Sequence, residues 1–246
     1  MKNYNILNEV LLSWGDSDEN IQDNAIIKSN DIKKKIDQCF IYRVDDGPSR
    51  IKIFDDGTRD GWPELEKYRD KIYIDNKHIE LNNEGWTINR FNPGEYRVYI
   101  KDIDQIYNCK CMFYHCKQLV SAYIPNISRN ISIGACAFKY CENLISVVIS
   151  NSPISINDDA FYDCISLTDI TIPNSVKHIG NNAFTCCSSL TSINIPANVD
   201  TIGTSAFREC NRLKEVYVED INKFKQIKFK NVYSNPLCYG AKLIEI

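Results

Sequence analysis

Apolar residues return at a fixed spacing through the second half of the chain. A phenylalanine, a cysteine three residues later and a leucine three residues after that occur five times, in steps of 25, 23, 23 and 23 residues. The phenylalanines are Phe113, Phe138, Phe161, Phe184 and Phe207. An apolar set held in register over five copies predicts a stack of similar coils, each too small to bury its apolar face alone.

One regular copy shows what each coil should contain. Leu167, Ile170 and Ile172 alternate with polar residues and predict a short strand whose apolar side chains point inward. Pro173 then ends the strand, because proline has no backbone N–H to donate to a neighbouring strand. Residues 181–187 predict a short helical or irregular turn before the next copy begins.

The first half of the chain has a different pattern. Ile32, Ile36 and Phe40 recur every four residues and predict a short amphipathic helix. Alternating apolar and polar residues, separated by turn-forming clusters, predict strands over 40–44, 50–54, 71–74, 78–81 and 96–100. The last of these strands should cover the open end of the stack, because a terminal coil exposes apolar side chains and unpaired backbone.

These patterns divide the chain into four parts and predict an α+β, mostly β, solenoid protein. The parts are an extended N-terminal arm at 1–28, a small β-rich module at 29–104, the repeat solenoid at 105–220 and a C-terminal cap of one or two strands at 221–246. If about six side chains per coil are buried at roughly 1.5–3 kcal/mol each, the stack supplies most of the folding free energy.

Charge and hydropathy narrow the classes of function. The chain carries 29 Lys and Arg against 32 Asp and Glu, and neither half has the dense basic surface of a nucleic-acid-binding protein. No stretch reaches the ~20 apolar residues of a membrane span. The N-terminus lacks the apolar core and cleavage site of a signal peptide. We therefore leave the location open between a virion, the cytoplasm and, if a leader was removed, a cell surface.

Eleven cysteines would ordinarily suggest a framework of disulfides. Five of them occupy a single repeat position, where a cysteine acts as a small buried hydrophobe. Packing thus explains them better than cross-linking does, and the odd total agrees. We expect buried, reduced thiols.

Candidate catalytic and metal-binding residues are few. His178 occupies a variable repeat position and is expected to face solvent, and no nucleophile elbow, phosphate-binding glycine loop or dinucleotide motif is present. Cys109, Cys111, His115 and Cys116 could nominally collect a zinc ion, but Cys-x-Cys is not the usual zinc-knuckle spacing and Cys116 belongs to the repeat. We expect no cofactor, no metal and no catalysis.

The repeat units carry a resemblance to a known family. The segments Leu167–Phe184 and Leu190–Phe207 share period, Ile-Pro, Ile-Gly and Ala-Phe, and they resemble the BspA-type leucine-rich repeat. The closing Tyr-Ser-Asn-Pro-Leu-Cys-Tyr-Gly resembles the segment that often follows such repeats. The likeness covers about residues 105–246 and implies a curved solenoid with a non-catalytic interaction role.

A curved repeat sheet offers a candidate binding surface. Side chains between the inward strand positions should form rows across the concave face, where tyrosines among small polar residues suit contact with a protein or glycan. The candidate ligand-binding residues are Tyr123, Val148, Thr171, Asn194, Lys214, Glu215 and Tyr217. A short β-sheet also tolerates surface tyrosines without any ligand, so this alternative stays open.

Two kinds of role fit these features, and both are non-catalytic. Family members on bacterial surfaces make a cell-surface adhesin or host-interaction protein one hypothesis. Family members encoded by phages make a virion structural protein the alternative, either a capsid decoration or a fibre component, with residues 1–40 contacting a capsid or tail protein. A hydrolase would need a histidine or a pair of carboxylates converging in the N-terminal module.

Overall fold

The computed structural model describes residues 39–44, 49–52, 72–74, 77–79, 87–100, 110–124, 131–150 and 153–246. The expected N-terminal arm and most of the expected helix at 32–40 lie outside these ranges. The helix prediction was wrong for its last two residues, which belong to strand β1 (Cys39–Val44). Phe40 pairs with Val98 on one side and Ala122 on the other, so pairing along both edges overrides the local helical pattern.

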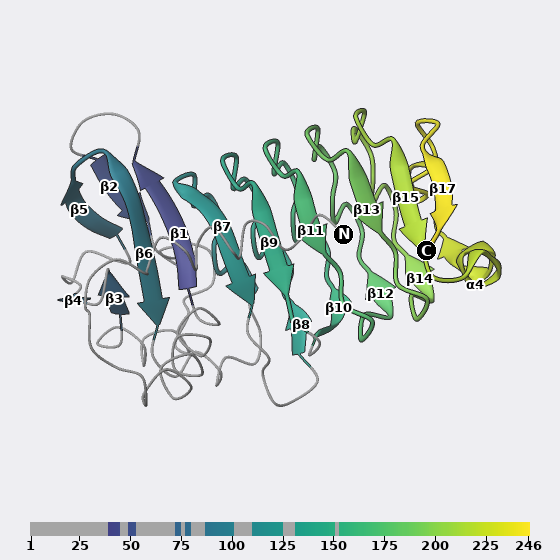
Figure 1. The fold of residues 1–246 in the computed structure, drawn as a ribbon, viewed down its shortest axis with the longest axis horizontal. Helices are drawn as coiled ribbons and strands as arrows, with labels where there is room; N and C mark the ends of the chain where they lie inside the picture. Colours follow the sequence, from purple (N-terminus) through teal and green to yellow (C-terminus); the bar gives the residue numbers. More distant parts are fainter. Residues whose placement is uncertain are drawn as a thin grey trace, which may run out of the picture. The chain divides into compact units, whose positions relative to one another are not determined.

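Parallel strands stack along the repeat region in two layers, which we call the front sheet and the back sheet (Figure 1). The front sheet contains five strands that begin at or just after a repeated leucine, and one strand from the C-terminal segment. The five are β7 (Leu119–Ile124), β9 (Ser146–Ile149), β11 (Asp169–Thr171), β13 (Ser192–Asn194) and β15 (Glu215–Val218), and the sixth is β17 (Lys242–Glu245). The back sheet contains β8 (Ile131–Ile133), β10 (Pro153–Ile156), β12 (His178–Ile179), β14 (Thr201–Ile202) and β16 (Lys228–Phe229). This arrangement confirms the predicted mostly β leucine-rich repeat solenoid.

The repeated phenylalanines form one continuous stack inside the solenoid. Phe161, Phe184 and Phe207 are fully buried, and successive ring centroids lie 5.3 and 5.4 Å apart with nearly parallel planes. The repeated cysteines and leucines are buried beside them. The predicted piling of apolar side chains along one axis is therefore confirmed.

The turn after each back-sheet strand also links neighbouring coils. Its residues are not helical, and their N–H groups donate to the next coil, as in Phe161 to the Ala183 carbonyl (2.8 Å) and Asp163 to the Thr185 carbonyl (2.8 Å). Two residues per turn adopt left-handed φ angles, such as Asp159 at 56° and Asp163 at 59°. The coils are thus hydrogen-bonded along a third side as well as through the two sheets.

The N-terminal module joins the first coil edge to edge. Its strands are β1, β2 (Ser49–Lys52), β3 (Ile72–Ile74), β4 (Lys77–His78), β5 (Thr87–Phe91) and β6 (Gly94–Ile100). Strand β1 pairs antiparallel with both β6 and β7, so it extends the front sheet. We expected the last strands of the module to cover this end; the contact is made by β1, with β6 one position further away. Strand β5 was not predicted.

The C-terminal segment forms another partial coil. Helix α4 (Ile221–Gln226) was not predicted. Asp220 caps its N-terminus, because the Asp220 carboxylate accepts hydrogen bonds from the N–H groups of Asn222 and Lys223. Strand β16 then pairs with β14, a 3-10 turn covers Val232–Ser234, and β17 pairs with β15. Strand β16 is thus the fifth described strand of the back sheet and β17 the sixth of the front sheet, so the one or two cap strands that the pattern suggested each extend one sheet.

Candidate functional site

The structure brings the predicted surface row together on the front sheet. Tyr123 lies opposite Val148 and Val148 opposite Thr171, while Asn194 lies opposite Tyr217. Strands β11 and β13 are neighbours but belong to separate hydrogen-bonded sheets, so the row continues across a seam between Thr171 and Asn194. Val148 is 38% exposed, so an apolar side chain of this row faces solvent.

The charged end of this row forms its own small cluster. The hydroxyl of Tyr217 donates a hydrogen bond to the carboxylate of Glu215, which raises the pKa of Tyr217 above its ordinary value. Glu215 also lies opposite Lys242 of β17. Lys214 is exposed, and its backbone N–H donates to the Thr191 carbonyl. Tyr217 and Glu215 are thus coupled directly, as their placement at one end of the row suggested.

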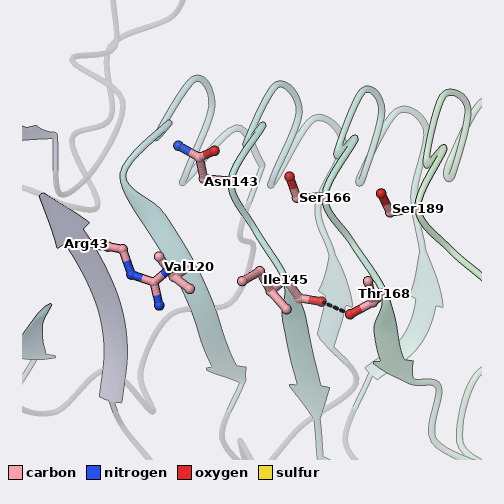
Figure 2. Close-up of a pocket in the computed structure, with 7 residues that line it drawn as sticks. All are labelled: Arg43, Val120, Asn143, Ile145, Ser166, Thr168 and Ser189. Carbon is pink, nitrogen blue, oxygen red and sulfur yellow. Dashed lines mark hydrogen bonds between the residues drawn. The ribbon is translucent and has the colours of Figure 1, made fainter. Parts of the chain in front are cut away.

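A groove lies beside this row, where the front strands begin (Figure 2). It encloses about 320 Å³, and the residues that line it are Arg43, Val120, Asn143, Ile145, Ser166, Thr168 and Ser189. Three of them immediately precede a repeated leucine and supply amide or hydroxyl groups. Three others immediately follow a repeated leucine, and two of those, Val120 and Ile145, supply an aliphatic floor. The sequence analysis missed the groove, although these flanking positions are periodic.

Arg43 reaches the groove from the N-terminal module. Figure 2 shows its side chain extending from β1 toward Val120 on β7. The guanidinium pairs with Glu95 of β6 at 2.6 Å, with both side chains about half exposed. The backbone N–H of Arg43 donates to the Gln118 carbonyl at 2.8 Å. The pairing of β1 with β7 therefore places a cation from the module at one end of a groove built by the repeats.

A second hollow, of about 490 Å³, lies along the back-sheet strands. His178 is exposed there as expected, and its Nδ1 atom contacts the Thr201 hydroxyl at 2.8 Å. The carboxylate of Asp158 accepts hydrogen bonds from the backbone and side-chain nitrogens of Asn181 at 2.7 and 3.1 Å. These polar groups of the hollow hold neighbouring coils together.

The nominal zinc cluster is not assembled in the part of the chain that the structure describes. Cys109 lies outside the described residues, and Cys116 is completely buried in the cysteine row. His115 packs against Tyr114 and Tyr140, with ring centroids 4.6 and 4.5 Å away. Across the described ranges, no group of three or more His, Cys, Asp or Glu side chains has a metal-binding arrangement. No described helix has the length and apolar character needed to cross a membrane.

Aromatic residues gather on the third side of the first coils, which sequence reasoning also missed. Tyr140 packs edge-on against Tyr162, with ring centroids 5.6 Å apart. The ammonium of Lys139 lies 4.4 Å from the Tyr162 ring centroid and pairs with Asp159 at 2.9 Å. These residues flank the repeated phenylalanines in the turns, but Tyr140 lies two residues after Phe138 and Tyr162 one residue after Phe161, so repeat period alone does not pair the two rings.

Comparison with known proteins agrees with this architecture. The family model described as BspA type leucine-rich repeat region matches residues 107–235 with six copies. No curated protein is detectably similar to the chain.

Solved structures of several bacterial proteins are similar in part. A T. pallidum leucine-rich repeat protein is 35% identical over 44% of this chain and 50% of its own, with a TM-score of 0.41. A leucine-rich cell surface protein from Faecalibacterium prausnitzii A2-165 is 23% identical over 63% of this chain and 41% of its own, with a TM-score of 0.37. The chain thus spans half or less of the length of these proteins. With the family model matching more than half of its residues, the chain belongs to the BspA-type leucine-rich repeat family.

Proposed function

We propose that this chain is a non-catalytic binding protein whose front sheet contacts a partner protein, in the setting of a cell-surface adhesin or host-interaction protein. The repeat family supports a role in interaction. The observation that carries the proposal is the exposed row on the front sheet together with the adjoining groove, which form one surface over several coils. A rigid stack of coils can present such a surface without rearrangement, which lowers the entropic cost of binding.

The chemistry of this surface suits a protein partner. Val148 and Ile145 are each 38% exposed, and they lie among hydroxyl and amide side chains. Tyrosine and arginine, the side chains most enriched at energetically important contacts, occur at Tyr123, Tyr217 and Arg43. Apolar centres surrounded by polar side chains are the usual composition of a protein interface.

A glycan remains the alternative ligand for the same surface. The groove floor is aliphatic, and among the described residues none that lines it is aromatic, so these residues offer no flat ring on which a sugar could stack. The virion alternative depended on residues 1–40, and of these the structure describes only the two that open β1. Among the described residues, none points specifically to attachment to a capsid.

Two matched substitutions test the proposal. Val148→Asp places a charge on the front sheet, and Ile154→Asp places one on β10 of the back sheet, at a residue equally exposed at 37%. We expect binding to an array of purified bacterial and host surface proteins to fall about tenfold or more, about 1.4 kcal/mol, in Val148→Asp and to persist in Ile154→Asp. The thermal unfolding midpoints of both variants should match each other.

The array results can also contradict the proposal. Equal binding by the wild type and both variants would show that the front sheet is not the contact surface. Binding that appears on a parallel glycan array alone, and is lost in Val148→Asp, would keep the surface and replace the protein partner with a glycan.

A further inference from the structure

Two cysteines lie next to each other at a position outside the buried cysteine row. Cys111 and Cys136 occupy the same place in the turns of the first two coils, 25 residues apart. Both have left-handed backbone conformations, with φ of 52° and 59°. In the later coils the same position holds Asp159, Asn182 and Ser205, so the pairing of two thiols occurs at this one step of the solenoid.

The backbone holds these two turns side by side. The N–H of Cys111 donates to the Ala135 carbonyl at 2.8 Å, and the N–H of Phe113 donates to the Ala137 carbonyl at 2.7 Å. Chains hydrogen-bonded in this way run about 4.8 Å apart. A disulfide accepts Cα separations of about 4.4–6.8 Å, so the two cysteines lie within bridging range.

The surroundings of this pair differ from those of the buried cysteine row. The side chains of Cys111 and Cys136 interact with each other, and both residues are partly exposed. In the buried row, Cys141 and Cys164 instead donate to the carbonyls of Phe113 and Phe138, at 2.9 and 3.1 Å, and solvent does not reach them. An oxidant can therefore reach the pair but not the row.

We propose that Cys111 and Cys136 form a reversible disulfide that fastens the first coil to the second when a low-molecular-weight disulfide, such as oxidised glutathione, is present. One cysteine thiolate attacks a sulfur of the oxidant, forming a mixed disulfide and releasing one glutathione thiolate. The other cysteine thiolate attacks the mixed disulfide at the protein sulfur, forming the internal bond and releasing the second glutathione. The two cysteine protons end on the released thiolates, so two thiols are oxidised and one disulfide is reduced.

The charges around the pair set the rate of this exchange. Burial raises the pKa of the Cys136 thiol, and the Asp159 carboxylate acts in the same direction, whereas Lys139 and Lys110 lower it. Since the thiolate is the attacking species, exchange should accelerate as pH rises. The disulfide would lie in the first coil, whose strand β7 pairs with β1. It would therefore stabilise the coil to which the N-terminal module is attached.

The test uses the full chain, treated with oxidised glutathione, quenched with acid, alkylated and digested with trypsin without reduction. We expect a cross-link between the peptide 111–117 and the peptide 130–139, a loss of two hydrogens in mass, and a rise in the thermal unfolding midpoint that reduction reverses. In Cys111→Ser and in Cys136→Ser, the yield of the cross-linked peptides should fall at least about tenfold, and the remaining thiol should carry glutathione. Cys186→Ser, a partly exposed cysteine at another left-handed turn position, is the matched control and should cross-link like the wild type.

Two results would overturn the proposal. One is glutathione on Cys111 and Cys136 of the wild type, or no reaction at either, without an internal cross-link. The other is a cross-link that survives in Cys111→Ser, because the bond would then involve Cys116, which lies in the same peptide. Neither result depends on the partner of the front sheet.

Discussion

The ring of Phe40 in strand β1 packs against the ring of Phe113 in the first coil, with centroids 4.8 Å apart. Phe113 in turn stacks on Phe138 at 4.9 Å. A side chain from the N-terminal module therefore continues the internal stack of the repeats by one more ring. The module and the first coils share a core as well as a sheet, so we expect them to unfold together.

Removing a ring should weaken the whole stack. Phe184→Ala deletes a fully buried ring between two others and should lower the free energy of unfolding by about 3–5 kcal/mol. Phe40→Ala should cost a similar amount, because Phe40 is also buried. Denaturant unfolding followed by circular dichroism measures both effects. If the module were independent of the repeats, Phe40→Ala would leave the main transition unchanged.

The glycine that follows Ile179 is required by close packing between coils. A Cβ atom on Gly180 would lie 2.5 Å from the carbonyl carbon of Asn157 and 2.5 Å from the backbone nitrogen of Asp158. Backbone cannot move aside as a flexible side chain can, so Gly180→Ala should destabilise the protein by at least about 1–3 kcal/mol. Thermal unfolding of the purified variant measures the loss.

Gly240→Ala is the control for this substitution. A Cβ atom there would meet nothing within 4 Å, and only the left-handed φ of 83° opposes the change. We expect a loss of about 1 kcal/mol from backbone strain. An equal or greater loss in Gly240→Ala would mean that steric crowding between coils is not what demands glycine at Gly180.

The buried cysteine row predicts a loss of stability in alkali. Burial raises the pKa of the Cys210 thiol from 9.0 to about 12. Below pH 9.0 the thiol is protonated in both the folded and the unfolded chain, so stability does not depend on its titration. Between pH 9.0 and 12 only the unfolded chain releases this proton, and stability should fall by about 1.4 kcal/mol per pH unit for the one thiol.

Cys210→Ala isolates this contribution. The variant is less stable at neutral pH because it loses buried volume, but its stability should fall less steeply over the alkaline range. Urea unfolding at a series of pH values gives both slopes. Identical slopes for the wild type and Cys210→Ala would show that the buried thiol does not control the alkaline transition.

The coupling of Tyr217 with Glu215 can be measured directly. The carboxylate accepts the hydrogen bond of the phenol, and this interaction raises the pKa of Tyr217. Glu215→Gln keeps an acceptor but removes the negative charge, so Tyr217 should ionise at lower pH than in the wild type. Ring carbon shifts in a pH titration by NMR report the change. Glu219→Gln, whose carboxylate contacts Asn174 instead, should leave the titration of Tyr217 unaltered.

The sequence analysis succeeded where one copy of the repeat explains another. The inward positions of Leu167, Ile170 and Ile172 and the stacking of Phe161 on Phe184 follow from period alone. It failed where a contact joins unlike segments. Phe40 ends a helical pattern and also opens the strand predicted at 40–44, and its strand partners lie 58 and 82 residues away at Val98 and Ala122.

At the candidate site too, contacts between equivalent repeat positions were predicted and contacts with other segments were not. The row through Val148 and Thr171 was predicted because equivalent positions of successive coils must line up. The groove was missed because one of its walls, Arg43, comes from outside the repeat. The thiol pair of Cys111 and Cys136 was missed because their left-handed turn position cannot be read from hydrophobic period.

By itself, the order of the residues determined that this protein is a solenoid and which side chains fill it. The repeat of apolar residues is visible along the sequence, and each coil packs against a near copy of itself. Only the tertiary structure decided that β1 enters the front sheet beside β7, that the C-terminal segment adds a rung to both sheets, and which groups meet at the surface. Those contacts join segments with no shared pattern. Their free energy depends on shape and hydrogen-bonding partners that exist only once the stack has formed.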